Sequence, residues 1–151
     1  MKKLIWIALI GLLFWGCAED IIVEASGELR GAYEGVYEIV WNYSSGSGQQ
    51  VTEKQNIEWA FTDLRFFMNV PEEDTSQITN NISGNYAVEE RLILSDIVKE
   101  PGSFKPESVP EGEFSLIRST TADGRDSLSL QQLDARNDAL KTIIIVRLEE
   151  E

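Results

Sequence analysis

The stretch LRGAYEGVYEIVWNY, residues 29–43, decides the fold. Its odd positions carry Leu, Gly, Tyr, Gly, Tyr, Ile, Trp and Tyr, while the even positions include Arg, two Glu and Asn. Because successive side chains of a strand point to opposite faces, this alternation predicts an aromatic-rich strand with one buried face. Such a strand would be about 50 Å long at about 3.3 Å per residue, and Gly31 and Gly35 on the inward parity allow it to coil. The stretch therefore predicts a bent first strand in a sheet that curls toward closure.

Seven further segments show strand-like alternation, and turn-like sequences separate most of them. A loop is expected at 99–111, where three prolines exclude a strand or helix interior. The Asp123-Gly124 pair is typical of a hairpin turn. Eight consecutive strands with short connections most simply form an all-β, eight-stranded antiparallel up-and-down barrel, here over residues 29–151. The seven segments are 51–61, 65–70, 82–88, 91–97, 112–118, 126–132 and 140–148.

The amino-terminal segment has the pattern of a secretory signal peptide. Lys2 and Lys3 precede the apolar run LIWIALIGLLFW, which is too short to favour a membrane span. Gly16 and then Cys17 follow the run, and this placement resembles the type II signal of bacterial lipoproteins. The resemblance implies that residues 1–16 are removed and that Cys17 becomes the acylated amino terminus. An ordinary signal peptide or an uncleaved anchor remains the alternative.

Residues 17–28 form an acidic tether in this interpretation. Ala18 after the cysteine resembles the outer-membrane sorting choice of Gram-negative lipoproteins. This implies a lipid-anchored protein of the bacterial cell envelope, on the periplasmic or the surface face of the outer membrane.

Charge and composition exclude several classes of function. The chain has 151 residues, enough for one domain, and a formal charge of −13. Such an acidic chain repels phosphate backbones, so no nucleic acid is expected as a partner, whereas a cationic protein would be attracted. Histidine is absent and cysteine occurs once, which removes His-based triads and cysteine-rich metal sites. We expect no cofactor, no metal and no enzyme activity, with a histidine-free hydrolase as the remaining enzymatic option.

Two short motifs near the start of the first strand resemble the lipocalins. Gly31-Ala32-Tyr33 and Gly35-Val36-Tyr37 are similar to the Gly-x-Trp motif of that family, with tyrosine in the aromatic place. The resemblance covers about residues 29–148 and implies a barrel that holds a small apolar ligand.

The inward positions of the eight strands leave open whether the barrel is hollow or filled. They carry 22 large side chains, which at the packing density of protein interiors could fill most of a small barrel. If there is a cavity, the aromatic residues with polar atoms are expected to orient the ligand. These candidate ligand-binding residues are Tyr37, Trp41, Trp59 and Tyr86.

The last strand does not alternate cleanly, because Ile143–Val146 is a continuous apolar run. Tyr43 of the first strand and Ile144, Val146 and Leu148 of the last are expected inside. Ile143 and Ile145 are then expected on the outer face, covered by the tether, by the proline loop or by another molecule.

Two functions of different classes follow from the sequence. The first is a lipid-anchored binding protein that holds a small apolar or amphipathic ligand inside the barrel. The second is a filled barrel that binds a protein, either as an inhibitor of a cationic envelope enzyme or as a subunit of an assembly.

Overall fold

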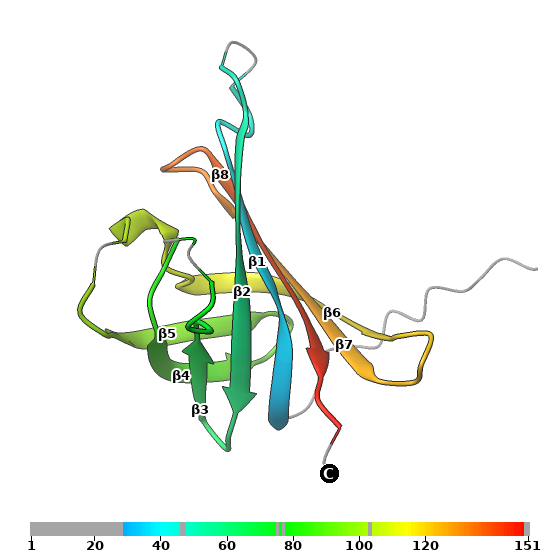
Figure 1. Cartoon of the computed structure of the whole chain (residues 1–151). Helices are drawn as coiled ribbons and strands as arrows, with labels where there is room; N and C mark the ends of the chain where they lie inside the picture. Colours follow the sequence, from blue (N-terminus) through cyan, green and yellow to red (C-terminus); the bar gives the residue numbers. More distant parts are fainter. Residues whose placement is uncertain (1–28, 46–47, 75, 77, 103, 150–151) are drawn as a thin grey trace, which may run out of the picture.

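The computed structural model describes residues 29–45, 48–74, 76, 78–102 and 104–149, so the predicted signal peptide, Cys17 and the tether lie outside the described residues. Figure 1 shows the arrangement of the strands. They are β1 (Gly31–Trp41), β2 (Val51–Phe61), β3 (Arg65–Asn69), β4 (Ile82–Val88), β5 (Leu92–Lys99), β6 (Gly112–Thr120), β7 (Asp126–Asp134) and β8 (Ala139–Arg147), with the 3₁₀ turn η1 (Pro106–Ser108) before β6.

The strands form a closed antiparallel barrel in which sequence neighbours are also spatial neighbours. Strand β1 pairs with β2 from Gly31↔Phe61 to Trp41↔Val51, and it pairs with β8 from Tyr33↔Arg147 to Trp41↔Ala139. The β5–β6 seam is the shortest, since only Leu92–Leu94 pair with β6 there. This arrangement confirms the predicted all-β, eight-stranded up-and-down barrel.

Gly35 explains how β1 and β8 come together so closely. A Cβ atom at this position would overlap the Ile144 carbonyl oxygen of β8 and would lie 2.8 Å from the Ile145 Cα. Only glycine leaves room for this approach, because any side chain would push the β8 backbone away. Strand β1 is therefore the strand on which the barrel closes.

Aromatic side chains fill the middle of the barrel. The rings of Trp59 and Phe61 stack with their centroids 5.5 Å apart, and Phe66 and Tyr86 pack on them at 5.3 and 5.1 Å. Tyr33 meets Phe61 edge to face at 5.8 Å. This spacing is the range in which aromatic pairs attract each other, so the middle of the barrel is a packed core.

The predicted direction of side chains in the last strand is wrong. Ile143 and Ile145 are fully buried inside the barrel, whereas Ile144 is 51 % exposed on its outer face. The inward positions of β8 also include Lys141, which is only 4 % exposed. Because this lysine shares the inward parity, the opposite parity of the strand was predicted to be the buried, apolar one. Cover by the tether or a partner is therefore not needed for Ile143 and Ile145.

Two other residues expected inside are on the surface. Tyr43 is 44 % exposed and Leu148 is 37 % exposed. Both lie beyond the ends of their strands, since β1 ends at Trp41 and β8 ends at Arg147. Residues past the last pair of a ladder leave the cylinder and no longer face its core.

The two ends of the barrel differ. At the closed end, in the upper part of Figure 1, the connections are the β1–β2 and β7–β8 hairpins and the long loops 70–81 and 100–111. At the open end, in the lower part, β1 begins, β8 ends and a short turn joins β2 to β3. Leu29, the first described residue, lies at the open end, where its carbonyl oxygen accepts a hydrogen bond from the Tyr86 hydroxyl at 2.6 Å.

Inward polar side chains hold the two long loops over the closed end. Gln55 of β2 donates to the Thr79 carbonyl oxygen at 3.1 Å and accepts from the Thr79 amide at 3.0 Å. The Tyr37 hydroxyl of β1 donates to the Ser108 carbonyl oxygen, and the Lys141 ammonium of β8 donates to the Val109 carbonyl oxygen at 3.2 Å. Buried backbone groups of a loop need such partners. These bonds allow loop residues to enter the core.

Candidate ligand-binding site

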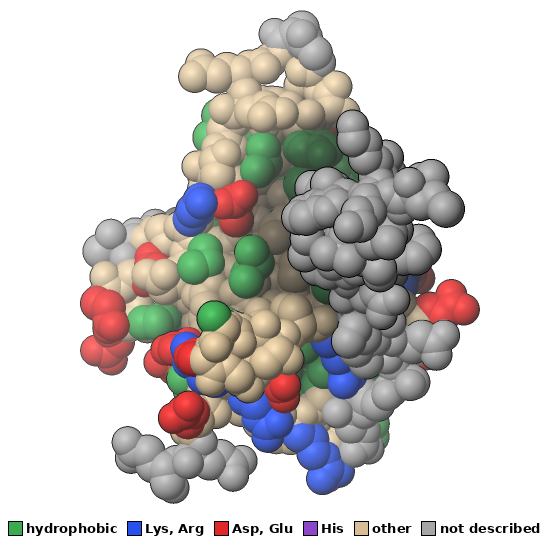
Figure 2. Space-filling model, turned by 90° about the vertical axis from the view of Figure 1, so that its right-hand side faces the viewer, with side chains coloured by type: hydrophobic (Ala, Val, Ile, Leu, Met, Phe, Trp, Pro, Cys, Tyr) green, Lys and Arg blue, Asp and Glu red, His purple; other side chains and the backbone are tan. Residues whose placement is uncertain are grey.

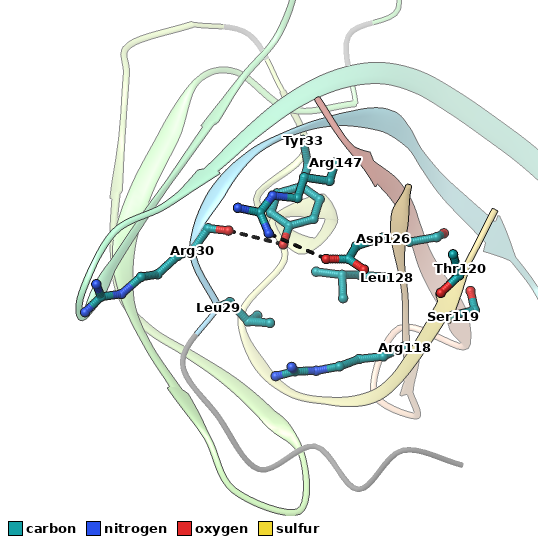
Figure 3. A pocket seen from close by; sticks show the side chains of 10 residues that line it. Leu29, Arg30, Tyr33, Arg118, Ser119, Thr120, Asp126, Leu128 and Arg147 are labelled. Carbon is teal, nitrogen blue, oxygen red and sulfur yellow. Dashed lines mark hydrogen bonds and ion pairs between the residues drawn. The ribbon is translucent and has the colours of Figure 1, made fainter. Parts of the chain in front are cut away.

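A cavity of about 450 Å³ opens at the open end of the barrel, on the side formed by β1, β6, β7 and β8 (Figure 3). Leu29, Tyr33 and Leu128 supply apolar surface, and Arg118, Asp126 and Arg147 supply charge. Small-molecule sites usually enclose about 300–1,000 Å³. The cavity, which we call the mouth cavity, is therefore large enough for a small ligand.

The charged residues of the mouth cavity lie on the inward parity of three neighbouring strands, near the open end. Arg118 continues the inward parity of Phe114 and Leu116 toward the end of β6, Asp126 is the first residue of β7, and Arg147 is the last residue of β8. Side chains of one parity point to one face of a strand. The inward rows of β7 and β8 thus end in charged groups at the rim, and Arg118 lies one inward position before the end of β6.

Gly31 leaves the space that the Arg147 side chain occupies. Gly31 has φ +105°, a conformation that favours glycine, and a Cβ there would lie 3.2 Å from Arg147 Nε. The guanidinium group can therefore lie against bare backbone at the start of β1. Its Nη1 atom is 3.5 Å from the Asp126 carboxylate, and both side chains remain substantially exposed. An ion pair at this exposure is weak, so Arg147 can bind another anion as well.

Tyr33 forms the wall between the rim and the aromatic core. It is buried, and its hydroxyl donates to the Arg30 carbonyl oxygen at 3.3 Å. Burial raises the pKa of this phenol, although the positive charge of Arg147 opposes the shift. Tyr33 is therefore neutral near pH 7. In Figure 3 the Arg30 side chain points away from the cavity. Its guanidinium group pairs with the Asp63 carboxylate at 2.9 Å.

Arg118 adds a second cationic group to the mouth cavity. Its side chain extends across the opening below Leu29 and Leu128 in Figure 3, and its Nε atom is buried. Arginine presents several N–H donors in one plane, which suits the two oxygens of a carboxylate or phosphate. Together with Arg147, this residue makes the mouth cavity suitable for an anionic group.

A second cavity, of about 580 Å³, lies at the closed end between η1 and the β7–β8 hairpin. Its inner wall includes Lys141, whose ammonium group is 3.3 Å from the Asp134 carboxylate. The pKa of Asp134 is lowered, because hydrogen bonds from Asn137 and Lys141 outweigh the opposing effect of desolvation. The buried cation of this cavity, Lys141, is already paired with Asp134 and donates to the Val109 carbonyl oxygen, so the cavity is the weaker candidate.

The four aromatic residues predicted to orient a ligand lie elsewhere. Tyr37 and Trp59 are buried in the core, and the Tyr86 hydroxyl donates to the Leu29 and Thr62 carbonyl oxygens. Trp41 is at the closed end, where its indole N–H donates to Glu53 and Lys105 lies over its ring. The indole N–H of Trp59 has no partner among the described residues. None of the four lines the mouth cavity, and their predicted role in binding stays a prediction.

Arg118 and Arg147 were not predicted as site residues from the sequence, for different reasons. Arg118 is the last residue of the predicted strand 112–118 and shares the parity of Phe114 and Leu116, so its inward position could have been predicted from the alternation alone. Arg147 shares the parity of Ile143 and Ile145, which was assigned to the wrong face.

The described residues contain no helix long and apolar enough to cross a membrane. No three His, Cys, Asp or Glu side chains are placed to hold a metal ion in the part of the chain that the structure describes.

Comparison with protein-family models, with curated protein sequences and with solved structures gave no match. The fold is thus a β-barrel with a buried aromatic cluster, and function has to be argued from the geometry of the site.

Proposed function

We propose that this chain is a lipid-anchored binding protein of the bacterial envelope that holds a small amphipathic anion in the mouth cavity. The observation that carries the proposal is the pairing of apolar walls with two guanidinium groups at one opening of the barrel. The packed core favours a ligand that enters only the rim over one that occupies the whole barrel. The apolar part of the ligand would contact Leu29, Tyr33 and Leu128, and its anionic group would bind Arg118 and Arg147.

The signal sequence supports the location of the protein. Residues 1–17 have the pattern of a bacterial lipoprotein signal, with Cys17 as the acylated residue and the outer membrane as the destination. A resident envelope protein that binds and releases a ligand needs no catalytic group, in agreement with the absence of histidine. Labelled palmitate should be incorporated by the natural chain and not by Cys17→Ser.

A direct binding titration tests the ligand site. The fluorescent anionic amphipath 1-anilinonaphthalene-8-sulfonate should bind the purified chain, and the double variant Arg118→Gln/Arg147→Gln should weaken binding by about tenfold or more. A hydrogen bond to a charged group contributes about 1.5–3 kcal/mol, and 1.4 kcal/mol corresponds to tenfold. Arg136→Gln, in the exposed β7–β8 turn at the other end, is the matched control and should leave binding unchanged. Equal binding by the double variant, or no binding by the natural chain, would overturn the proposal.

The acidity of the closed end favours a second candidate, a protein-binding role. This end carries more carboxylates than cationic groups, which would attract a cationic envelope protein. The charge reversals Glu72→Lys and Glu107→Lys should then abolish capture of such a protein from envelope extracts at low salt. Capture that survives both reversals would remove this candidate.

A further inference from the structure

The open end of the barrel combines three features that suit contact with a membrane surface. It holds the mouth cavity, it is the end from which the chain continues toward residue 17, and arginine side chains gather there. Figure 2 shows Lys and Arg side chains, with Asp and Glu side chains beside them, along the lower edge of one face of the molecule, which is this end. Each feature belongs to a separate part of the sequence, and the closure of the barrel brings them together.

Charge separates the two ends of this acidic protein. The strand ends and turns of the open end carry six cationic groups and six carboxylates, so this end has no net charge. The cationic groups are Arg30, Arg65, Arg91, Arg118, Arg125 and Arg147, and the carboxylates are Asp63, Glu89, Glu90, Asp123, Asp126 and Glu149. The closed end carries nine carboxylates against four cationic groups. The carboxylates are Glu53, Glu72, Glu73, Asp74, Glu100, Glu107, Glu111, Asp134 and Asp138, and the cationic groups are Lys99, Lys105, Arg136 and Lys141.

This asymmetry orients the molecule in the field of a negatively charged surface. The closed end is repelled, whereas the open end offers guanidinium groups to phosphate oxygens. The effect acts over about 8–10 Å at physiological salt, so it matters once the chain is held near the membrane.

Exposed leucines accompany the arginines at the open end. Leu64, in the turn between β2 and β3, is 69 % exposed beside the Arg30–Asp63 ion pair. Leu148 follows Arg147 at the end of β8 and is 37 % exposed. Apolar side chains next to basic ones are the combination that binds the boundary between headgroups and acyl chains.

The distance to the anchor agrees with this orientation. Eleven residues separate Cys17 from Leu29, and they span at most about 36–40 Å when fully extended. Since Leu29 lines the mouth cavity, a lipid on Cys17 would attach to the barrel at its open end.

We propose that the open end is a membrane-docking surface, which rests on anionic phospholipid headgroups so that the mouth cavity opens toward the bilayer. The proposal rests on the proposed lipid anchor and deepens the proposed ligand site, because it names the lipid surface as the place where ligand is exchanged. Arg30, Arg118, Arg125 and Arg147 contact phosphates, and Leu64 and Leu148 enter the headgroup layer.

Depth measurements on the anchored chain test the orientation. Cys17 is the only cysteine, so an introduced cysteine can carry a single fluorophore once Cys17 is acylated. Ser119→Cys places the label at the mouth and Ala135→Cys places it in the β7–β8 turn of the closed end. In vesicles of phosphatidylglycerol and phosphatidylcholine that contain spin-labelled lipid, the label at 119 should be quenched at least threefold more than the label at 135. Equal quenching, or the reverse order, would overturn the proposal.

A matched pair of variants separates docking from ligand binding. Leu64→Asp should reduce the difference in quenching at least twofold, whereas Leu133→Asp, at a residue 61 % exposed near the closed end, should leave it unchanged. Neither residue lines the mouth cavity, so both variants should bind the anionic probe as the natural chain does. Loss of the quenching difference in Leu64→Asp, with intact probe binding, would show that this variant prevents docking without affecting the ligand site. Labelling of the unsubstituted chain by the thiol reagent would instead show that Cys17 is not acylated, which contradicts the proposed anchor.

Discussion

The two ends of the barrel use inward polar residues in opposite ways. At the closed end, hydrogen bonds to the backbone of two long loops come from Tyr37, Gln55 and Lys141. Ile78 and Val109 of these loops are buried. At the open end, only short turns connect the strands, and Arg118 and Arg147 face a cavity. The same strand, β8, contributes Lys141 to one end and Arg147 to the other. The connection above an inward polar residue therefore decides whether that residue holds a covering loop or faces a cavity.

Removal of the charge of Lys141 should have the largest effect on stability. In Lys141→Met the partly buried Asp134 carboxylate loses its cation and the Val109 carbonyl oxygen loses its donor. Breaking a buried pair from one side costs about 3–5 kcal/mol, and we expect the lower end of this range because Asp134 is partly exposed. Urea denaturation measures the loss. A change below about 1 kcal/mol would contradict the structural role assigned to Lys141.

Gln55→Leu should have the next largest effect, about 2 kcal/mol. The substitution keeps a side chain of similar size but leaves the amide and the carbonyl oxygen of Thr79 without partners in a buried place. Hydrogen exchange should show lost protection in residues 76–81 before any change in β6 and β7. Uniform loss of protection over the whole chain would mean that the closed end is not a separate unit.

High pH should destabilise the closed end through Tyr37. Burial, together with the negative charge of Asp134, raises the pKa of this phenol well above its usual value. Because the folded pKa is raised, the contribution of Tyr37 is complete below the unfolded pKa of about 10 and is lost as pH rises toward the folded value, by up to about 1.4 kcal/mol per pH unit. Denaturation at pH 9 and pH 11 should show a loss of about 1 kcal/mol that is smaller in Tyr37→Phe. An identical loss in the variant would assign the effect to other groups.

Arg147→Gln should have the smallest effect on stability, below about 1 kcal/mol. Arg147 pairs with Asp126 at 3.5 Å at an exposed rim, where ion pairs contribute little. The same denaturation experiment, set beside Lys141→Met, compares two cationic residues of one strand. A loss as large as that of Lys141→Met would contradict the difference between a structural cation at the closed end and an exposed one at the open end.

Much of the fold could be predicted from the sequence because strand periodicity is local. The alternation in residues 29–43 and the Asp123-Gly124 turn depend on residues that are close in the chain, and all eight strands were predicted within a few residues. The parity of β8 could not be assigned because Ile143–Val146 is apolar on both faces. Only the pairing of β8 with β1 and β7 settles which of these residues point inward.

The candidate site was harder to predict than the fold. Aromatic residues with polar atoms were expected to bind the ligand. Trp59 and Tyr86 instead both pack against Phe61 in the core. The mouth cavity depends on Leu29, Arg118 and Arg147, which are far apart in the chain and meet only when the cylinder closes.

The amino-acid sequence by itself determined the strand order, the acidity of the chain and the placement of Cys17 behind an apolar run, because periodicity, charge and signal patterns are properties of consecutive residues. The tertiary structure alone decided which face of β8 is buried, that long loops cover one end, and that two arginines share a cavity with apolar walls at the other. These features depend on pairing between distant strands, which fixes the direction of every side chain around the barrel.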